Sequence, residues 1–312
     1  MNNSVNFDLT ILGTGSASPQ LDRNPSACIL SLDTDLLLID CGEGTQYRLL
    51  EHKVKHNRIR HILISHLHGD HYFGLIGLLS SFNLARRTEP LTLIGPPGLN
   101  EILSIQFQYS ETDLCYDLEF IETRPQESSL ILDHPRFTIE TIPLSHRVPC
   151  NGYLIREKTS KRKIKKEVLP PNLPIPYIKS LIDGVDVQDE RTGEVFKVED
   201  LTIPAPPARS FAYCSDTQYL PSLIDVVRGV DLLYHEATFD DALVDRAAKT
   251  FHSTARQAAT IAQAAGVGQL VISHFSSRYK SLDSHLSEAK SVFPNTLLAE
   301  EGLTVSIGNS QL

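Results

Sequence analysis

The stretch HILISHLHGDHYFGLIG, residues 61–77, most constrains what this chain can fold into. Between its two apolar runs, six residues contain four potential metal ligands: His66, His68, Asp70 and His71. Buried imidazole and carboxylate groups are costly unless they have partners, so a surface histidine-rich loop fits poorly with apolar runs on both flanks. Imidazole and carboxylate suit zinc and tolerate manganese or iron. The stretch therefore predicts a divalent metal site at the end of a buried strand.

Strand-like and helix-like segments alternate in both halves of the chain, which predicts an α/β fold. FDLTILG, SACILSL and HILIS have the composition of strands, whereas EGTQYRLLEH, TARQAATIAQAAG and a segment around 217–228 are helix-like. Several strand-like segments end in histidine or aspartate: His66, His146, Asp216, His235 and His274. Because functional groups collect on the loops that leave strand ends, these side chains are expected to share one rim.

A hydrolytic site with two ions needs more ligands than residues 61–77 supply. His146 in PLSHRVPCNGY, Asp216 in AYCSDTQY and His274 in VISHFSSRY each follow a strand-like segment. Any one of them alone is more often an ordinary polar residue of the core or surface. Their joint occurrence favours a common site.

Residues 156–200 interrupt the alternation with a basic run, a proline-rich stretch and an acidic end. Between residues 156 and 167, seven basic and two acidic side chains give a local charge of +5, although the net charge of the chain is −9. The acidic average argues against a nucleic-acid partner, but a local basic patch can override it. A segment of this length with few core signals is either a solvated linker or a functional extension.

Cysteine usage and hydropathy bear on the compartment. The five cysteines are scattered, so reduced thiols in the cytoplasm are expected rather than a disulfide framework. No apolar run approaches the roughly 18 residues needed to span a bilayer, and the first residues do not have the pattern of a cleaved signal. The sequence thus predicts a soluble cytoplasmic protein without a membrane partner.

These motifs resemble those of a known family. SHLHGDH is similar to the signature of the metallo-β-lactamase superfamily, and the chain resembles its ribonuclease Z family over nearly its whole length. The more specific motifs are HEAT (235–238) and HST (252–254), with ILGTGSASP, IDCGEGTQYRL, HRVPCNGY, YCSDT and ISHFSSRY in support. The resemblance implies an α/β fold of the αββα type, with two facing mixed sheets flanked by helices. It further implies a single domain, 1–312, with a protruding flexible tRNA-binding arm at 156–197.

The resemblance also implies a ligand set for two Zn²⁺ ions per subunit, with Mn²⁺ or another divalent ion possible. His66, His68 and His146 would hold one ion. Asp70, His71 and His274 would hold the other. Asp216 would bridge them, and two ions about 3.5–4 Å apart can lower the pKa of a water molecule from 15.7 toward about 7. Asp70 would also orient or deprotonate that water, and Asp40 would orient a ligand imidazole. As an alternative, Asp40 is the N-cap of the following helix.

The family's proton donor to the leaving ribose oxygen corresponds to His252, paired with Glu236. The Glu236 carboxylate favours the charged, imidazolium form of His252, whereas the positive end of the helix that starts near Ser253 disfavours it. We expect the effect of Glu236 to be the larger. The implied function is zinc-dependent endonucleolytic removal of the 3′ trailer from precursor tRNA, just after the discriminator base. The implied assembly is a homodimer in which the arm of one subunit grips the tRNA that the other cleaves.

Two other readings stay open. A small-molecule hydrolase or phosphodiesterase of the same superfamily explains the metal site but not the basic segment or HST. An inert RNA-binding protein is disfavoured by the complete ligand set. Arg23 and Asn24 match a family loop near the cleavage site, but the basic residue often found earlier in that loop is replaced by the run Gln20–Asp22. The sequence therefore leaves open whether precursors that already carry CCA are cleaved.

Overall fold

Two seven-stranded β-sheets form the centre of the protein in the computed structural model, which describes residues 6–308. The chain divides into two compact units. The first contains the residues up to Asp133, Ile139–Ile155 and the residues from Arg209 onward. The second contains His134–Thr138 and Arg156–Ala208.

The first sheet has the strand order β18-β1-β2-β3-β4-β5-β6. Its strands are β1 (Phe7–Gly13), β2 (Ala27–Leu32), β3 (Asp35–Ile39), β4 (Ile59–Leu63), β5 (Leu91–Gly95), β6 (Leu118–Glu122) and β18 (Thr304–Ser306). Strands β3 to β6 run parallel to one another, whereas β1 and β2 pair antiparallel. Parallel strands buried on both faces read as near-continuous apolar runs, which is why β3 lacks an alternating pattern from Leu36 to Ile39.

The second sheet has the order β17-β16-β15-β14-β9-β8-β7. Its strands are β7 (Leu130–Asp133), β8 (Phe137–Pro143), β9 (Asn151–Glu157), β14 (Ser210–Cys214), β15 (Leu232–Glu236), β16 (Gln269–Ser273) and β17 (Thr296–Leu298). Strands β14 to β17 are parallel. Their carboxyl ends therefore lie at the same edge of this sheet, where the residues that follow each strand can meet.

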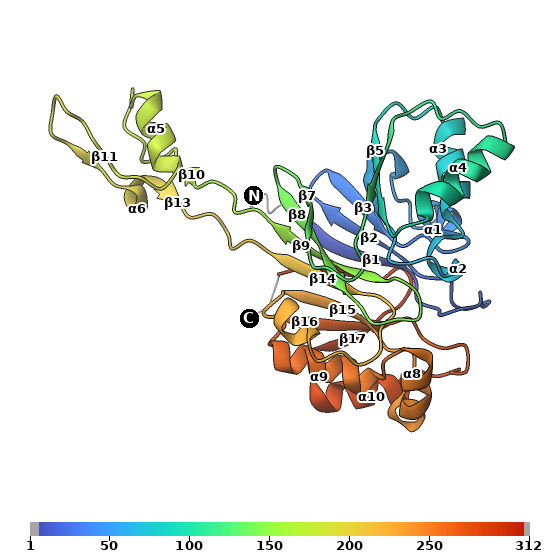
Figure 1. Cartoon of the computed structure of the whole chain (residues 1–312). Helices are drawn as coiled ribbons and strands as arrows, with labels where there is room; N and C mark the ends of the chain where they lie inside the picture. Colours follow the sequence, from blue (N-terminus) through green and yellow to red (C-terminus); the bar gives the residue numbers. More distant parts are fainter. Residues whose placement is uncertain (1–5, 309–312) are drawn as a thin grey trace. The chain divides into compact units, whose positions relative to one another are not determined.

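Helices cover the outer faces of the two sheets (Figure 1). Beside the first sheet lie α1 (Thr45–Glu51), α2 (Gly69–Tyr72), α3 (Leu75–Leu84) and α4 (Leu99–Tyr109). Beside the second lie α7 (Leu223–Val226), α8 (Val244–Thr250), α9 (Ala255–Ala265) and α10 (Asp283–Val292). Short 3₁₀ turns, η1 (His56–Arg58) and η2 (Asp241–Leu243), complete this unit. The expected α/β fold with two mixed sheets flanked by helices is confirmed.

Helix α9 shows how the local sequence sets an element. Thr254 caps its first turn by accepting from the backbone N–H of Gln257, while the Gln257 side chain accepts from the backbone N–H of Thr254. Gly266 ends the helix in the left-handed region with a φ of 63°. The buried face of α9 is mostly alanine, which allows the helix to lie close to β15 and β16.

The second unit has a small core of its own. It contains β10 (Lys163–Ile164), α5 (Ile175–Ile182), β11 (Val187–Gln188), β12 (Val195–Phe196), α6 (Val198–Leu201) and β13 (Thr202–Ile203). Strand β10 pairs with β13, and β11 pairs with β12. Leu173, Leu181, Phe196 and Leu201 form its buried cluster. Residues 156–197 are therefore folded rather than a structureless linker.

The helix expected around 217–228 is wrong over most of its length, since only Leu223–Val226 is helical. The backbone N–H of Thr217 donates to Glu236 Oε1 at 2.9 Å, and that of Gln218 donates to the Ser145 carbonyl at 3.0 Å. These tertiary bonds replace the intrahelical ones. Pro221 also lacks the N–H that a longer helix would use at that position.

Candidate metal centre

The loop that leaves β4 places the first group of potential ligands. His66 and His68 follow the strand, and the single turn of α2 then carries Asp70 and His71. His66 and His71 are completely or almost completely buried. Because α2 begins directly after His68, the two histidines that precede the helix lie close to Asp70 and His71 within it.

The other potential ligands come from the edge of the second sheet. His146 lies between β8 and β9, Asp216 two residues after β14, and His274 directly after β16. Since β14 and β16 are parallel strands in one sheet, Asp216 and His274 reach the same edge. The seven residues expected from the sequence are thereby brought together.

Asp216 lies between two sets of side chains. Its Oδ2 is 3.6 Å from Nε2 of His66 and 3.6 Å from Nε2 of His146. His68 completes this first set, because its Nδ1 is 3.1 Å from each of those two Nε2 atoms. These four residues form a group whose donor atoms all lie within 4.8 Å of one another.

The other oxygen of Asp216 faces the second set. Oδ1 is 3.3 Å from His71 Nε2 and 3.2 Å from His274 Nε2. Asp70 Oδ2 lies 3.5 Å from the former nitrogen and 3.4 Å from the latter. Among the described residues, Asp216 Oδ1 is buried without a hydrogen-bond partner. A buried carboxylate oxygen of this kind fits a cation as its missing partner.

Hydrogen bonds aim the imidazole lone pairs into the cluster. Nδ1 of His71 donates to Asp40 Oδ2 at 2.8 Å, and Nδ1 of His146 donates to the Phe251 carbonyl at 2.9 Å. Thr238 Oγ1 donates to Glu236 Oε2, so it accepts from His274 Nδ1 at 2.9 Å. In each ring the opposite nitrogen, Nε2, faces Asp216, and it is the atom that would bind a metal.

Burial and charge set the protonation states of the cluster. Burial lowers the pKa of His66, His68 and His146, and neighbouring imidazoles lower it further. Burial opposes ionisation of Asp216, but His274, His71 and His66 hold its pKa well below the usual range. His71 differs, because the carboxylates of Asp216, Asp70 and Asp40 outweigh its burial and raise its pKa well above the usual range, so a metal ion would displace its proton. Imidazoles beside an ionised carboxylate are a donor set that suits zinc.

Asp40 links the two sets of ligand-type side chains through hydrogen bonds, directly to His71 and through Ser65 to His66. It is completely buried and accepts from the Ser65 backbone N–H at 2.8 Å, Ser65 Oγ at 2.9 Å and the Tyr213 hydroxyl at 2.8 Å, besides His71. Ser65 Oγ also lies 3.0 Å from His66 Nδ1. The alternative that Asp40 caps the next helix is wrong, because Gly44 is the N-cap of α1. No local signal predicted Ser65 or Tyr213.

His252 lies between α8 and α9, beside the cluster and next to Glu236, the last residue of β15. Its Nδ1 is 2.8 Å from Glu236 Oε1 and 3.9 Å from Asp216 Oδ2. Burial disfavours the charged ring, but the Glu236 carboxylate outweighs it and raises the pKa of His252 to about 9, in the direction expected. Glu236 is fully buried and also accepts from Thr238. Thr238 thus contacts both His252 and His274, a link that its motif alone did not reveal.

Three residues at the site have left-handed backbone conformations, which non-glycine residues seldom adopt. The φ angles are 56° at Asp40, 59° at Phe251 and 63° at His274. Such conformations cost on the order of 1 kcal/mol and concentrate where the surrounding structure holds a functional group in place. Here they direct a carboxylate, a carbonyl and an imidazole toward the cluster.

Other residues singled out from the sequence lie outside the cluster. His235 is buried, and its Nδ1 donates to the Glu236 carbonyl at 2.7 Å. The Arg23 guanidinium donates to the Tyr279 carbonyl, and Asn24 Nδ2 donates to Glu301 at 2.7 Å. These contacts occupy Arg23 and Asn24 within the fold.

Known proteins share both the sequence and the architecture. Ribonuclease Z from Cytophaga hutchinsonii is 49% identical over 298 residues, covering 96% of this chain and 95% of that protein. Ribonuclease Z from Bacteroides fragilis is 43% identical over 302 residues, with 96% and 99% covered. The structure of human tRNase Z, short form, has a TM-score of 0.70 and 28% identity, and covers 96% of this chain and 99% of that one.

Two further likenesses are more distant. The metallo-beta-lactamase fold protein YhfI from Bacillus subtilis has a TM-score of 0.68 at 21% identity, covering 97% of this chain and 100% of that one. The family model described as Anti-Pycsar protein Apyc1 matches residues 7–148. The two helix-flanked sheets and the histidine–aspartate cluster thus define a protein of the metallo-β-lactamase fold class. Within that class, the chain belongs to the ribonuclease Z family.

Proposed function

We propose that this chain removes the 3′ trailer from precursor tRNA by one cut just after the discriminator base, with two zinc ions per subunit. Membership of the ribonuclease Z family makes it a tRNA 3′-processing endoribonuclease. The observation that carries the two-ion proposal is Asp216, whose two carboxylate oxygens face different sets of ligand-type side chains. One carboxylate placed in this way can bridge two cations.

The donor atoms fit divalent metal. His66, His68 and His146 would hold one ion, and Asp70, His71 and His274 would hold the second. Manganese would suit the same mixture of imidazole and carboxylate. When bound, the ions would supply a water molecule of lowered pKa as the nucleophile and would stabilise negative charge on the phosphate oxygens.

The residues around the cluster would handle the protons. Asp70 Oδ2 also accepts from the backbone N–H of Ala17 at 2.6 Å, which holds this carboxylate in position to orient the attacking water. Because Nδ1 of His252 is bonded to Glu236, the proton available to substrate is the one on Nε2. That proton would pass to the ribose 3′ oxygen as the phosphorus–oxygen bond breaks. Glu236 would stabilise the imidazolium before this transfer.

The test combines cleavage mapping with metal analysis. Zinc-loaded protein should cut a precursor tRNA just after the discriminator base, and Asp70→Ala should abolish this cut and lower bound zinc. His252→Ala should slow cleavage about 10²- to 10⁴-fold at unchanged zinc content, the usual scale for loss of a general acid. His56→Ala, an exposed histidine outside the cluster, is the control. Zinc loss in His252→Ala would contradict its assignment as proton donor.

The second unit is proposed to bind the tRNA. It carries the basic run between Arg156 and Lys166, and lysines that contact phosphates make affinity fall steeply with salt. A variant in which a short Gly-Ser linker replaces the arm at 156–197 should still hydrolyse a small phosphodiester but process precursor tRNA poorly. Undiminished tRNA processing by that variant would refute the role of the arm.

Assembly and compartment remain proposals. We infer a homodimer in which one subunit's arm grips the tRNA that its partner cleaves, which sedimentation of the intact protein would test. A cytoplasmic location agrees with the five cysteines, all of them free thiols. Within residues 6–308, none of the helices combines the length and apolar character needed to cross a membrane.

A further inference from the structure

A groove of about 560 Å³ opens beside the candidate metal centre. It is lined by Pro97, by residues 122–127 between β6 and β7, and by Leu144 and residues 146–150 between β8 and β9, and is called the side groove below. One lining residue, His146, is also a member of the metal-ligand set. Another, Cys150, places its Sγ 3.7 Å from His66 Nδ1. The volume lies in the usual range for a small-ligand site.

The middle of the side groove combines flat apolar walls with polar groups. Pro125, Val148 and Pro149 supply the apolar surface, and Gln126 contributes an amide to the lining. The Thr123 side chain is 1% exposed, and its hydroxyl has no hydrogen-bond partner among residues 6–308. A buried hydroxyl left unpaired is costly unless a ligand or water completes it. An unpaired nucleobase has the matching chemistry, a flat face and a polar edge.

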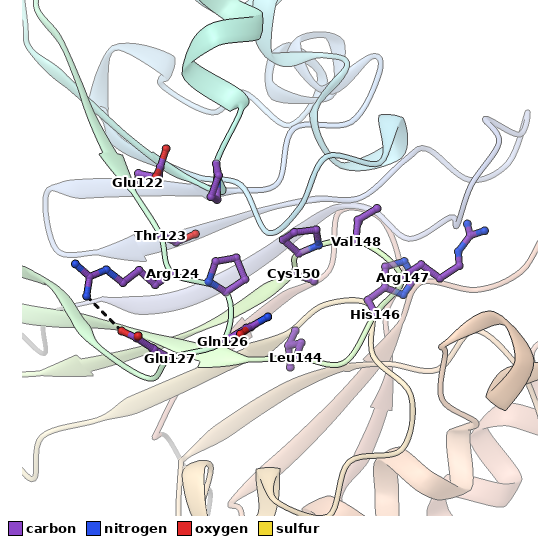
Figure 2. A pocket seen from close by; sticks show the side chains of 13 residues that line it. Glu122, Thr123, Arg124, Gln126, Glu127, Leu144, His146, Arg147, Val148 and Cys150 are labelled. Atoms are coloured by element: carbon purple, nitrogen blue, oxygen red, sulfur yellow. Dashed lines mark hydrogen bonds and ion pairs between the residues drawn. The ribbon is translucent and has the colours of Figure 1, made fainter.

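Charge is distributed unevenly along the side groove. Arg124 and Arg147 lie at opposite ends (Figure 2), and only Arg124 has an acidic partner, Glu127 at 3.4 Å. Arg147 is exposed and forms no ion pair with any residue that the structure describes. Glu122 and Glu127 both lie toward the Arg124 end. A phosphate is therefore favoured at the Arg147 end, next to His146, and a second or third phosphate is disfavoured further along.

The position of the side groove relative to His252 assigns the strand that would enter it. Along the second sheet, Glu236 at the end of β15 bonds His252, Asp216 follows β14, and His146 precedes β9. The side groove lies beyond His146, toward the β8 and β7 edge. Under the proposed function, His252 serves the 3′ oxygen that stays with the tRNA. The strand on the other side of the cut is the trailer.

We propose that the side groove binds the first nucleotide of the trailer, with its base between residues 123–126 and 148–149 and its phosphates near Arg147. This inference rests on the proposed function, since it names a substrate subsite of the same reaction. The ligand class is a short single-stranded RNA that carries a 5′ phosphate, which is the trailer as it leaves the cut. Because the far end is acidic, the site accommodates one or two nucleotides.

Direct binding tests the subsite without requiring cleavage. The probes are fluorescently labelled RNA dinucleotides and decanucleotides, with or without a 5′ phosphate, titrated into zinc-loaded protein and followed by anisotropy. The 5′-phosphorylated dinucleotide should bind as tightly as the decanucleotide. Arg147→Ala and Gln126→Ala should each weaken binding, Arg147→Ala by about tenfold, the scale of one charge-assisted hydrogen bond to phosphate.

Controls separate this site from general charge and from damage to the cluster. Arg228→Ala removes an exposed arginine that pairs with Asp225 away from the side groove, and it should leave dinucleotide binding unchanged. Mature tRNA should bind Arg147→Ala and the wild type equally. If Arg147→Ala loses zinc, Gln126→Ala alone decides the outcome.

The subsite proposal would be overturned if the wild type and Gln126→Ala bound the dinucleotide equally well. It would also be overturned if dinucleotide affinity did not depend on the 5′ phosphate. Failure of the wild type to cut precursor tRNA would instead overturn the proposed function, whatever the dinucleotide does.

Discussion

Asp40→Asn tests the idea that a buried carboxylate organises both halves of the metal centre. Asp40 Oδ2 receives hydrogen bonds from Ser65 Oγ, His71 Nδ1 and the Tyr213 hydroxyl, and Oδ1 receives one from the Ser65 backbone. An asparagine has one acceptor oxygen, so in either orientation its NH₂ group must face at least one of these donors. With the NH₂ group at the Oδ2 position, His71 would lose the acceptor that directs its Nε2 into the cluster; with the NH₂ group at the Oδ1 position, it would keep an acceptor but lose the negative charge that strengthens the bond.

The expected effect is a 10- to 100-fold loss of zinc affinity, the usual scale for removing the hydrogen-bond partner of a ligand imidazole. This corresponds to about 1.4–2.8 kcal/mol. Competition with a chromophoric chelator of known zinc affinity measures it directly, at neutral pH and independently of catalysis.

Asp231→Asn is the matched control. Asp231 Oδ2 accepts from the Ser210 backbone N–H at 2.7 Å and from Ser210 Oγ at 2.9 Å, as Asp40 accepts from Ser65, but no ligand-type histidine bonds to it. Both variants should lower the free energy of unfolding of the metal-free protein, whereas only Asp40→Asn should weaken zinc binding. Equal zinc affinities in the two variants would refute the organising role of Asp40.

Three further predictions follow from packing, burial and metal linkage. Gly74→Ala would place a Cβ 2.1 Å from the Gly42 carbonyl oxygen and should lower the free energy of urea unfolding by at least about 1–3 kcal/mol. Gly77→Ala, whose Cβ would lie 3.4 Å from its nearest neighbour, should raise that free energy by about 0.5–1 kcal/mol. Equal effects of the two substitutions would contradict this packing argument. Burial lowers the pKa of His285 from 6.5 to about 4, so its contribution is present above pH 6.5 and lost as the pH falls toward 4. His285→Gln should remove about 3 kcal/mol of that pH dependence, and superimposable wild-type and variant curves would count against it. Zinc at 100 times its Kd should stabilise the wild type by about 2.7 kcal/mol against thermal unfolding, and should stabilise Asp216→Asn by much less. Equal stabilisation of both proteins would mean that zinc binds at a site without Asp216.

The local sequence predicted many of the strands and helices and singled out the candidate ligand residues that the fold brings together. The capped alanine-rich stretch 254–266 specifies its helix through contacts within a few residues, whereas the apolar run 7–13 indicates a strand that pairs with residues 27–32 and 304–306. Ligand-type side chains after strands were recognisable because parallel strands end at one edge of a sheet. The same reasoning failed at 217–222, where backbone groups bond to Glu236 and Ser145 instead of to each other.

The tertiary structure alone decided how those residues are held. Tyr213 and Asp40 are 173 residues apart, and His146 and Phe251 are 105 apart, yet these pairs set the orientation of two imidazoles in the cluster. The side groove likewise combines segments that precede β7 and β9. Periodicity and capping depend on neighbours in the chain, whereas the partner of a buried polar group depends on which distant segments the packed core brings within about 3 Å of it.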